Sequence, residues 1–427
     1  MISFLPNRQD AKSAKKGTKI AFVVSEFPAL SETFILNQIV GLRKHGYEVD
    51  IYAEKQRNEP KIHPDVEKYD LLSHTYYAEK MPQSRFGRLL KSIGLILTNF
   101  PKAPKLMLRV LNIFKYGKKY GSLTLLYEVI PWLRWGLSYD IIHCHFGTNG
   151  LKGALLQEVG AIQGKLITTF HGMDVNVVPR QYGVDVYKQL FLQGDLYTVN
   201  TEFTRQQVIA LGCPEDKIFK LPVGFQISQY SFCDRKLNSG EAVKIITVAR
   251  LVEKKGIEYA IKAIAEIAKD HPNIIYRIVG DGSLRESLEC LVLDLKISDN
   301  VKLLGWMTQE QVRQLYDDSH IFILPSVTAA DGDREGQALV LQEAQAMGLP
   351  ILSTLHNGIP EGVLDGESGF LVPERDVEAL AKKLRYLVTN PEVWAKMGRQ
   401  GRAYVEERYN IEQLNQQLVE IYQKLMN

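Results

Sequence analysis

The chain has 427 residues, of which 45% are hydrophobic and 24% are charged, and its formal net charge is +3. This length exceeds what one hydrophobic core usually organises, so two domains are expected, and the composition excludes both a disordered and a collagen-like chain. The small net charge points to no particular partner, and nucleic acid is not expected among the partners.

The N-terminal residues and the cysteines of the chain predict a cytoplasmic protein. Residues 1–18 are polar and rich in lysine, which predicts a disordered basic N-terminus without the apolar segment of a signal peptide. No later run is long and apolar enough for a transmembrane helix. The four cysteines stand far apart, without the spacing of a zinc site or a disulfide framework, which favours a reducing compartment. They are Cys144, Cys213, Cys233 and Cys290.

Short β-branched runs alternate with amphipathic stretches, a pattern typical of α/β proteins with parallel sheets. In a first domain, residues 19–230, strands are predicted at KIAFVVS, EVDIYA, DIIHCHF, KLITTFHG, LYTVNT and IFKLPVG. Helices are predicted between them, including Thr33–His45 and Glu202–Leu211. The series describes one doubly wound, Rossmann-like domain.

A polar stretch without periodicity, residues 231–241, is predicted to be a linker. It leads into a second Rossmann-like domain, residues 242–408, with strands predicted at VKIITVARL, IIYRIVG, NVKLLGW, IFILPS and PILST. The helices predicted between these strands include Ile257–Lys269, Leu284–Leu295 and Leu339–Met347. The chain is expected to be helical from Glu392 onward, with residues 409–427 packing back toward the first domain.

One segment of the first domain, residues 85–119, is basic and amphipathic. No acidic residue occurs between Glu79 and Glu128, and basic residues alternate there with aliphatic ones. Such helices bind anionic membrane surfaces, although a pair of solvated helices covering the sheet would have a similar pattern. The basic residues are Arg85, Arg88, Lys91, Lys102, Lys105, Arg109, Lys115, Lys118 and Lys119.

The second domain offers cations and glycines at strand ends. Arg250 and Lys255 follow the strand VKIITVAR, where α/β sheets bind ligands, and Gly256 precedes a helix. Two cations and a helix dipole would hold a diphosphate, although an Arg and a Lys in a turn can also simply be solvated. Gly280, in the VGDG turn after the next strand, would allow close approach of a nucleotide or serve turn geometry alone.

The segment EGQALVLQE places Glu335 and Glu343 eight positions apart, at the start of a helix that Gly336 opens and within that helix. One carboxylate could meet the hydroxyls of a sugar and the other a ribose diol. The amides of Ala338, Leu339 and Val340 would face phosphate oxygens. Alternatively, the glutamates complement the helix dipole and lie on a solvated face.

ARLVEKKG, VGDG and EGQALVLQE, in this order within two Rossmann-like halves, resemble the retaining GT-B glycosyltransferases of family four (group 1). SEFPALSETFILNQI, HCHF and TFHGMD resemble the subset that builds bacterial exopolysaccharides, including colanic-acid-type enzymes. The resemblance implies two domains facing a cleft and transfer of a hexose from a sugar nucleotide to a glycan or lipid-linked oligosaccharide, with retention of configuration. It implies no cofactor beyond the sugar nucleotide, and a cytoplasmic enzyme peripheral at the inner face of the plasma membrane.

The resemblance also implies roles for residues. Arg250 and Lys255 would bind the diphosphate, Glu343 the ribose and Glu335 the transferred sugar, while His171 in TFHG would reach across the cleft as a second catalytic residue. Ser31, Glu32 and Thr33 are candidates for the acceptor side. Gln337 stands where the family usually has an aromatic residue, so the sugar is left open.

Single features of the sequence suggest other functions. His143 and His145 share one face of a strand but lack a third ligand at a sensible spacing, so no metal site is expected. Asp331-Gly332-Asp333 matches the metal-binding string of GT-A enzymes but lies late in the second sheet. A nicotinamide dehydrogenase is excluded because SEFPALSET has no glycine. A sugar-nucleotide 2-epimerase and a degenerate nucleotide-binding scaffold remain as alternatives.

Overall fold

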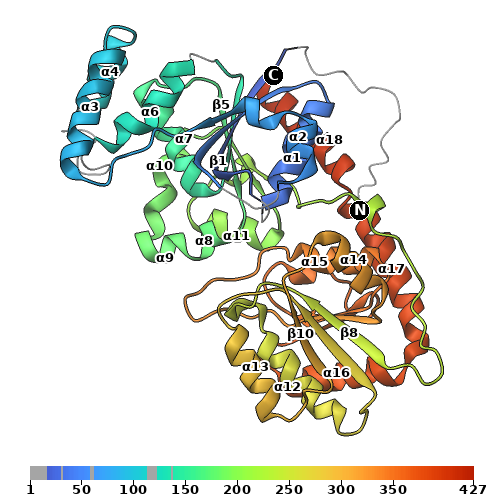
Figure 1. Cartoon of the computed structure of the whole chain (residues 1–427). Coiled ribbons are helices and arrows are strands. Elements are labelled where there is room, and N and C mark those ends of the chain that lie inside the picture. The colour runs from blue at the N-terminus through green and yellow to red at the C-terminus, as the bar shows by residue number, and fades with distance from the viewer. Residues whose placement is uncertain (1–16, 30–31, 58–61, 113–122, 136–137) are drawn as a thin grey trace. The chain divides into compact units, whose positions relative to one another are not determined.

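The computed structural model describes residues 17–29, 32–57, 62–112, 123–135 and 138–427 (Figure 1). The chain divides into two compact units. Unit 1 contains residues up to Thr169 together with Tyr187–Tyr197 and Asn415–Asn427, and unit 2 contains Phe170–Val186 and Thr198–Leu414. Nearly all of the predicted N-terminal extension lies outside the described residues.

The first sheet has seven strands in the order β3-β2-β1-β4-β5-β6-β7, and β1 pairs in parallel with both β2 and β4. The order reverses between β1 and β4, which makes that point the topological switch of a doubly wound sheet. The strands are β1 (Lys19–Phe27), β2 (Glu48–Gln56), β3 (Thr75–Tyr77), β4 (Ile141–His145), β5 (Lys165–Phe170), β6 (Leu196–Val199) and β7 (Ile218–Lys220).

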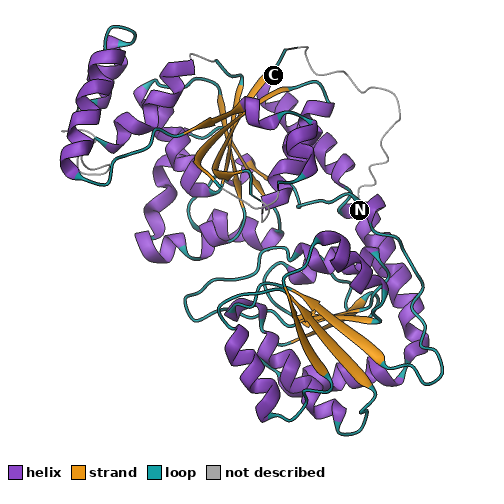
Figure 2. Ribbon diagram, viewed as in Figure 1, coloured by secondary structure: helices purple, strands orange, loops and turns teal. Residues whose placement is uncertain are grey.

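The second sheet has six strands in the order β10-β9-β8-β11-β12-β13, with its switch point between β8 and β11. Its strands are β8 (Val243–Val248), β9 (Ile274–Val279), β10 (Val301–Gly305), β11 (Ile321–Leu324), β12 (Ile351–Thr354) and β13 (Gly369–Val372). The predicted α/β class and the two doubly wound parallel sheets are thus confirmed. Figure 2 shows helices on both faces of the second sheet.

The predicted strands and helices occur where the patterns placed them, within a few residues. The described helices are α1 (Thr33–Lys44), α2 (Pro64–Lys68), α3 (Arg85–Asn99), α4 (Pro104–Val110), α6 (Thr124–Trp135), α7 (Gly147–Val159), α8 (Met173–Asn176), α9 (Val178–Tyr182), α10 (Lys188–Gln193), α11 (Glu202–Ala210), α12 (Ile257–Ala268), α13 (Arg285–Asp294), α14 (Gln309–Asp317), α15 (Leu339–Ala346), α16 (Val377–Thr389), α17 (Trp394–Arg408) and α18 (Ile411–Met426).

The core of unit 2 follows from helical periodicity. Helix α12 buries residues at three- and four-residue spacing, including Ile257, Ile261 and Ile264, and packs against α16. The indole of Trp394 is completely buried, and its Nε1 donates to the carbonyl oxygen of Leu387 at 2.9 Å. This packing fixes the sheet whose carboxyl end carries the candidate site.

Two short strands, β3 and β13, were not predicted from the sequence. β3 has three half-buried residues, and β13 begins with a glycine, so neither shows the alternation or the apolar run that predicts a strand. Both lie at sheet edges, where strands are short and only one side pairs.

The helical run predicted from Glu392 is interrupted at Tyr409 and Asn410. There the backbone of Phe225 bonds to the carbonyl oxygen of Tyr409 and the N–H of Ile411, at 3.1 and 3.2 Å, and separates α17 from α18. Residues from Asn415 onward belong to unit 1, where a Cβ on Gly41 of α1 would lie 1.9 Å from Nδ2 of Asn415. A larger residue at position 41 would therefore force the Asn415 side chain to move.

The stretch predicted to be a linker is irregular in the structure but partly packed. The guanidinium of Arg235 is 4% exposed and donates to the carbonyl oxygens of Asp317 and Met347. The guanidinium therefore forms hydrogen bonds with backbone carbonyl groups of unit 2 rather than with water.

Candidate active site

Three loops of unit 2 leave the carboxyl ends of β8, β11 and β12 and interlock. The N–H of Val327, after β11, donates to the carbonyl oxygen of Lys254, after β8, at 2.9 Å. A Cβ on Gly256 would lie 1.9 Å from the carbonyl oxygen of Pro325, and its φ is +61°. Only glycine fits this crossing, which brings Lys255 beside the β11 loop.

The side chains of Lys255 and Glu335 form an ion pair in which they are 11% and 13% exposed. Burial by itself would raise the pKa of Glu335, but the charges of Lys255 and Lys254 outweigh it and lower that pKa. The carboxylate is therefore ionised at neutral pH. Lys254 also pairs with Asp333, at 2.9 Å. The structure thus brings together two predicted site residues that are 80 positions apart.

The loop after β12 forms hydrogen bonds with the backbone of Glu335. The Glu335 N–H donates to Nε2 of the buried His356 at 3.0 Å, and Asn357 Nδ2 donates to the Glu335 carbonyl oxygen at 3.1 Å. Because Nε2 accepts, the ring proton of His356 is on Nδ1, which donates to Glu374 at 2.5 Å. Burial lowers the pKa of His356, opposed by its hydrogen bond to Glu374, so the ring is neutral. Both backbone groups of Glu335 are thus fixed.

Arg250 and Gly280 lie at the ends of adjacent strands β8 and β9. Arg250 is exposed. A Cβ on Gly280 would lie 1.9 Å from the carbonyl oxygen of Ala249, and its φ is +133°. The N–H of Leu251 donates to the carbonyl oxygen of Asp281 at 2.9 Å, which ties the VGDG turn to the Arg250 loop. Gly280 is required here for turn geometry.

Helix α15 begins directly after the Glu335 loop. Ala338, its N-cap residue, has a φ of +54°, and the first helical residues are Leu339 and Val340. The side chain of Gln337 exchanges two hydrogen bonds with the backbone of Val223, both at 2.7 Å. Gln337 is therefore a buried structural residue, and an aromatic side chain could not make this pair of bonds.

Glu343 lies one to two turns into α15, next to the ring of Tyr230. Burial raises the pKa of Glu343 to about 7, and the Tyr230 hydroxyl and the charge of Arg313 oppose this shift. The same hydroxyl accepts from Gln309 Nε2 at 2.9 Å. Glu343 therefore titrates near neutral pH rather than lying on a solvated face.

His171 lies in the part of the chain that belongs to unit 2. Its N–H and that of Gly172 both donate to the carboxylate of Asp174, at 3.0 and 2.8 Å, which shapes the turn. The carbonyl oxygen of His171 would lie 2.7 Å from a Cβ on Gly336, so Gly336 allows close approach of this turn. Burial lowers the pKa of His171 to about 3, which keeps the imidazole neutral.

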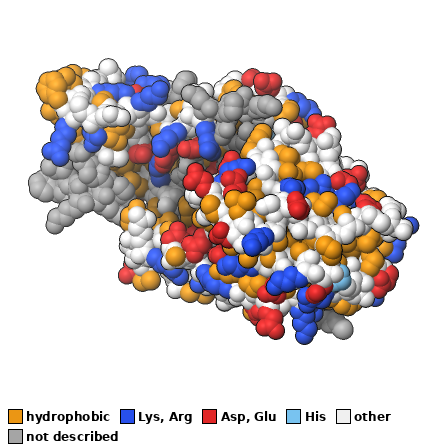
Figure 3. Space-filling view, turned by 60° about the horizontal axis from the view of Figure 1, so that its bottom comes forward, with side chains coloured by type: hydrophobic (Ala, Val, Ile, Leu, Met, Phe, Trp, Pro, Cys, Tyr) orange, Lys and Arg blue, Asp and Glu red, His pale blue; other side chains and the backbone are white. Residues whose placement is uncertain are grey.

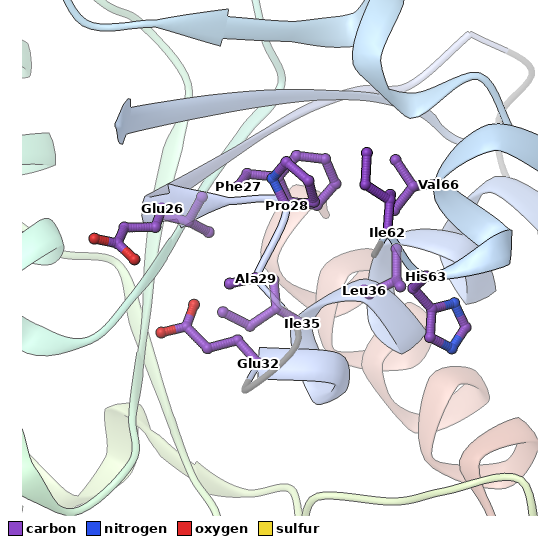
Figure 4. A pocket seen from close by; sticks show the side chains of 11 residues that line it. Glu26, Phe27, Pro28, Ala29, Glu32, Ile35, Leu36, Ile62, His63 and Val66 are labelled. Atoms are coloured by element: carbon purple, nitrogen blue, oxygen red, sulfur yellow. The ribbon is translucent and has the colours of Figure 1, made fainter. Parts of the chain in front are cut away.

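The acceptor-side candidates lie in unit 1. Ser31 is outside the described residues, while Glu32 precedes α1 and Thr33 begins it. Glu32 lines a pocket together with Glu26 and apolar side chains such as Phe27, Ile62 and Val66 (Figure 4). Burial and the charge of Glu26 raise the pKa of Glu32, and Arg57 opposes them. The pocket thus has a carboxylate end and an apolar end.

The features that suggested metals have other partners. His143 Nδ1 and Nε2 lie 2.6 Å from the hydroxyls of Tyr422 and Thr169, and the ring of His143 stacks on that of His145 at 4.7 Å. Asp333 pairs with Lys254, and Asp331 accepts from the N–H of Asp333. Within the described residues, no cluster of three or more His, Cys, Asp or Glu is placed to hold a metal ion.

Two family models match this chain. Residues 233–404 match the model described as glycosyl transferases group 1, and residues 31–229 match glycosyltransferase family 4. WcaL of Escherichia coli K12, provisionally named a colanic acid biosynthesis glycosyltransferase, is 34% identical over 95% of this chain and 100% of its own. The amylovoran biosynthesis glycosyltransferase AmsK of Erwinia amylovora is 34% identical with the same coverage.

The chain belongs to the family 4 glycosyltransferases. Its fold is GT-B, since sucrose-phosphate synthase of Thermosynechococcus elongatus aligns with a TM-score of 0.68 at 20% identity, over 96% of this chain and 99% of that one. The Anabaena protein HepE, solved in complex with UDP, aligns with a TM-score of 0.68 at 18% identity, over 95% and 100%. No described helix of the glycosyltransferase has the length and apolar character to cross a membrane.

Several residues of this glycosyltransferase site were not found from sequence. His356 and Asn357 contact Glu335, and Tyr230 contacts Glu343. Glu374 in turn bonds to His356, and none of these four residues stands in a recognisable motif. A histidine two residues after the short strand PILST was the one available signal, because the carboxyl ends of parallel strands share an edge.

Proposed function

We propose that this glycosyltransferase moves a hexose from a sugar nucleotide to a glycan or lipid-linked oligosaccharide in the synthesis of a bacterial exopolysaccharide. The observation that carries the proposal is the buried Lys255–Glu335 pair beside the start of α15. It supplies a cation for the diphosphate and a carboxylate for sugar hydroxyls at one place. The names of WcaL and AmsK support the biosynthetic role, and the bound UDP in HepE supports the kind of donor.

In the proposed donor complex, Arg250 and Lys255 would bind the diphosphate, together with the amides of Ala338, Leu339 and Val340 at the start of α15. Gly280 and Gly336 would let backbone approach the nucleotide. These groups would balance the charge of the leaving diphosphate without a metal ion, so turnover is expected to continue in the presence of a chelator.

The carboxylates and His171 would orient the sugar. Glu343 would accept hydrogen bonds from the ribose diol, and Glu335 from hydroxyls of the transferred sugar. His171 would act as a neutral hydrogen-bonding group, because burial depresses its pKa. It would therefore position the sugar and not supply positive charge.

The proposed reaction retains the anomeric configuration. The bond between the anomeric carbon and the diphosphate oxygen breaks while the acceptor oxygen bonds to the same face of that carbon. The proton of the acceptor hydroxyl passes to the leaving phosphate oxygen. Of the acceptor-side candidates Ser31, Glu32 and Thr33, Glu32 lines the pocket of unit 1 and would contact the acceptor there (Figure 4).

The test is an assay of nucleoside diphosphate release with UDP-, GDP- and ADP-sugars, with and without lipid-linked glycans extracted from bacterial membranes. We expect nucleoside diphosphate release to depend on the lipid-linked extract. NMR should show an α-linked product from an α-linked donor. Conversion of the sugar nucleotide without acceptor would indicate the epimerase alternative, which the family match does not favour. Nucleotide binding without any turnover would indicate the degenerate scaffold.

We further propose that the enzyme works in the cytoplasm, as a peripheral protein at the inner face of the plasma membrane. A lipid-linked acceptor is held there, and the segment 85–119 offers positive charge for an anionic surface. Residues 113–119 of that segment lie outside the described residues.

A further inference from the structure

Helix α3 in unit 1 presents its more apolar face to solvent. The side chains of Phe86 and Leu97 are 72% and 69% exposed, and those of Leu89, Leu90 and Ile93 are between 45% and 54% exposed. The residues buried on the opposite face are Ser92, Leu95 and Asn99. A helix that only covered a sheet would have the reverse distribution, with its apolar stripe inward.

The exposed apolar residues form one stripe. Phe86, Leu89, Leu90, Ile93 and Leu97 follow each other at steps of one, three or four residues, which keeps them on one side of a helix. Leu108 of the neighbouring helix α4 is exposed as well, at 62%. Helix α4, which contacts α3, thus also has an exposed apolar side chain.

Polar contacts on the inner face fix the rotation of α3. The hydroxyl of Ser92 lies 3.2 Å from that of Tyr127 in α6, and the Tyr127 hydroxyl donates to the carbonyl oxygen of Arg88 at 2.9 Å. The inner face is thus bound to α6 through buried hydrogen bonds. Turning the apolar stripe inward would break them, so the stripe stays exposed in this fold.

The charge around the stripe is positive. Arg85, Lys102 and Lys105 are exposed, and neither α3 nor α4 contains an acidic residue. Lys91, by contrast, is paired with Glu79 at 2.7 Å. Figure 3 shows hydrophobic and basic side chains next to one another at the left end of the view, where α3 and α4 lie in Figure 1.

We propose that α3 and α4 dock this face on an anionic lipid surface, with α3 lying parallel to the membrane plane. The apolar stripe would enter the boundary between headgroups and acyl chains, and the exposed cations would contact anionic headgroups. A second copy of the chain fits less well, because the same positive face would oppose itself without an acidic partner. The inference rests on the proposed function only for the lipid-linked acceptor that brings the enzyme there.

The experiment is flotation of the full-length protein with vesicles of phosphatidylcholine alone or with roughly 30 mol% phosphatidylglycerol. The wild type is expected to float with the anionic vesicles, and less so at high salt. The double variant Phe86→Ser/Leu97→Ser should bind them about tenfold more weakly or worse. A matched control is Leu192→Ser/Leu293→Ser, since these leucines are 70% and 66% exposed on other helices.

Failure of the wild type to bind anionic vesicles, or equal binding by the Phe86/Leu97 variant, would overturn the inference. A wild-type dimer that this variant converts to a monomer, without vesicle binding, would instead make the face a self-interface. Melting of each variant with and without nucleotide separates the two proposals. Vesicle binding without any sugar transfer would refute the proposed function and leave the docking surface standing.

Discussion

Because Lys255 forms an ion pair with Glu335, the substitution Lys255→Ala should affect both the stability of the protein and its nucleotide affinity, and the two effects can be measured separately. Lys255→Ala removes a cation from the proposed diphosphate site and also leaves a carboxylate that is only 13% exposed without its closest partner. Breaking a buried pair costs about 3–5 kcal/mol. Because Lys254 also lowers the pKa of Glu335, a loss of unfolding free energy near the lower end, about 3 kcal/mol, is expected.

The effect on binding has a different size and origin. A charge-assisted hydrogen bond from lysine contributes about 1.5–3 kcal/mol, so Lys255→Ala should weaken nucleoside diphosphate binding by roughly 10- to 150-fold. In the double variant Lys255→Ala/Glu335→Gln, the uncompensated charge is gone. It should therefore recover part of the lost stability while its nucleotide affinity stays low.

Chemical denaturation gives the stabilities and calorimetric titration gives the affinities of the three variants. Lys254→Ala is the matched control, because Lys254 is 12% exposed and pairs with Asp333. It should lose stability and keep most of its nucleotide affinity. Wild-type affinity in Lys255→Ala, or full recovery of affinity in the double variant, would refute the assignment of Lys255 to the diphosphate.

Three further predictions concern the same site. Because the pKa of Glu343 is raised to about 7, sugar-nucleotide affinity should fall as pH falls below that value, by up to about tenfold per unit, and titrations of Glu343→Gln should show no such dependence. Gly280→Ala should cost more than about 1 kcal/mol of stability in denaturant melts, since its Cβ would overlap the carbonyl oxygen of Ala249; an unchanged midpoint would contradict the turn geometry. His356→Ala removes the acceptor of the Glu335 N–H and should lower kcat more than nucleotide affinity; steady-state kinetics showing the reverse would mean that His356 does not position Glu335.

The parts of this fold that could be predicted are those with local signals. Clear apolar periodicity predicts β8, β9 and α12, and the EGQALVLQE segment predicts a loop followed by a helix. The edge strands β3 and β13 were missed because three or four residues at a sheet edge show neither alternation nor a long apolar run.

The sequence offers candidate site residues one by one, but not the contacts among them. Nothing local indicates that Lys255 meets Glu335, because the chain crossing at Gly256 and Pro325 creates that pair. The hydrogen bonds of His356 to the Glu335 backbone and of Gln337 to Val223 likewise depend on tertiary structure. The exposure of the apolar face of α3 is another such case, since the pattern alone fits a buried stripe equally well.

Unit 2 is proposed to bind the nucleoside diphosphate of a sugar donor. The most direct test is the melting temperature of the purified chain with UDP, GDP, ADP and their common sugars, because a ligand that binds only the folded state stabilises it by mass action. One nucleotide series is expected to raise the melting temperature, which would identify the donor. A cooperative transition that no nucleotide shifts at any concentration up to millimolar would contradict this proposal.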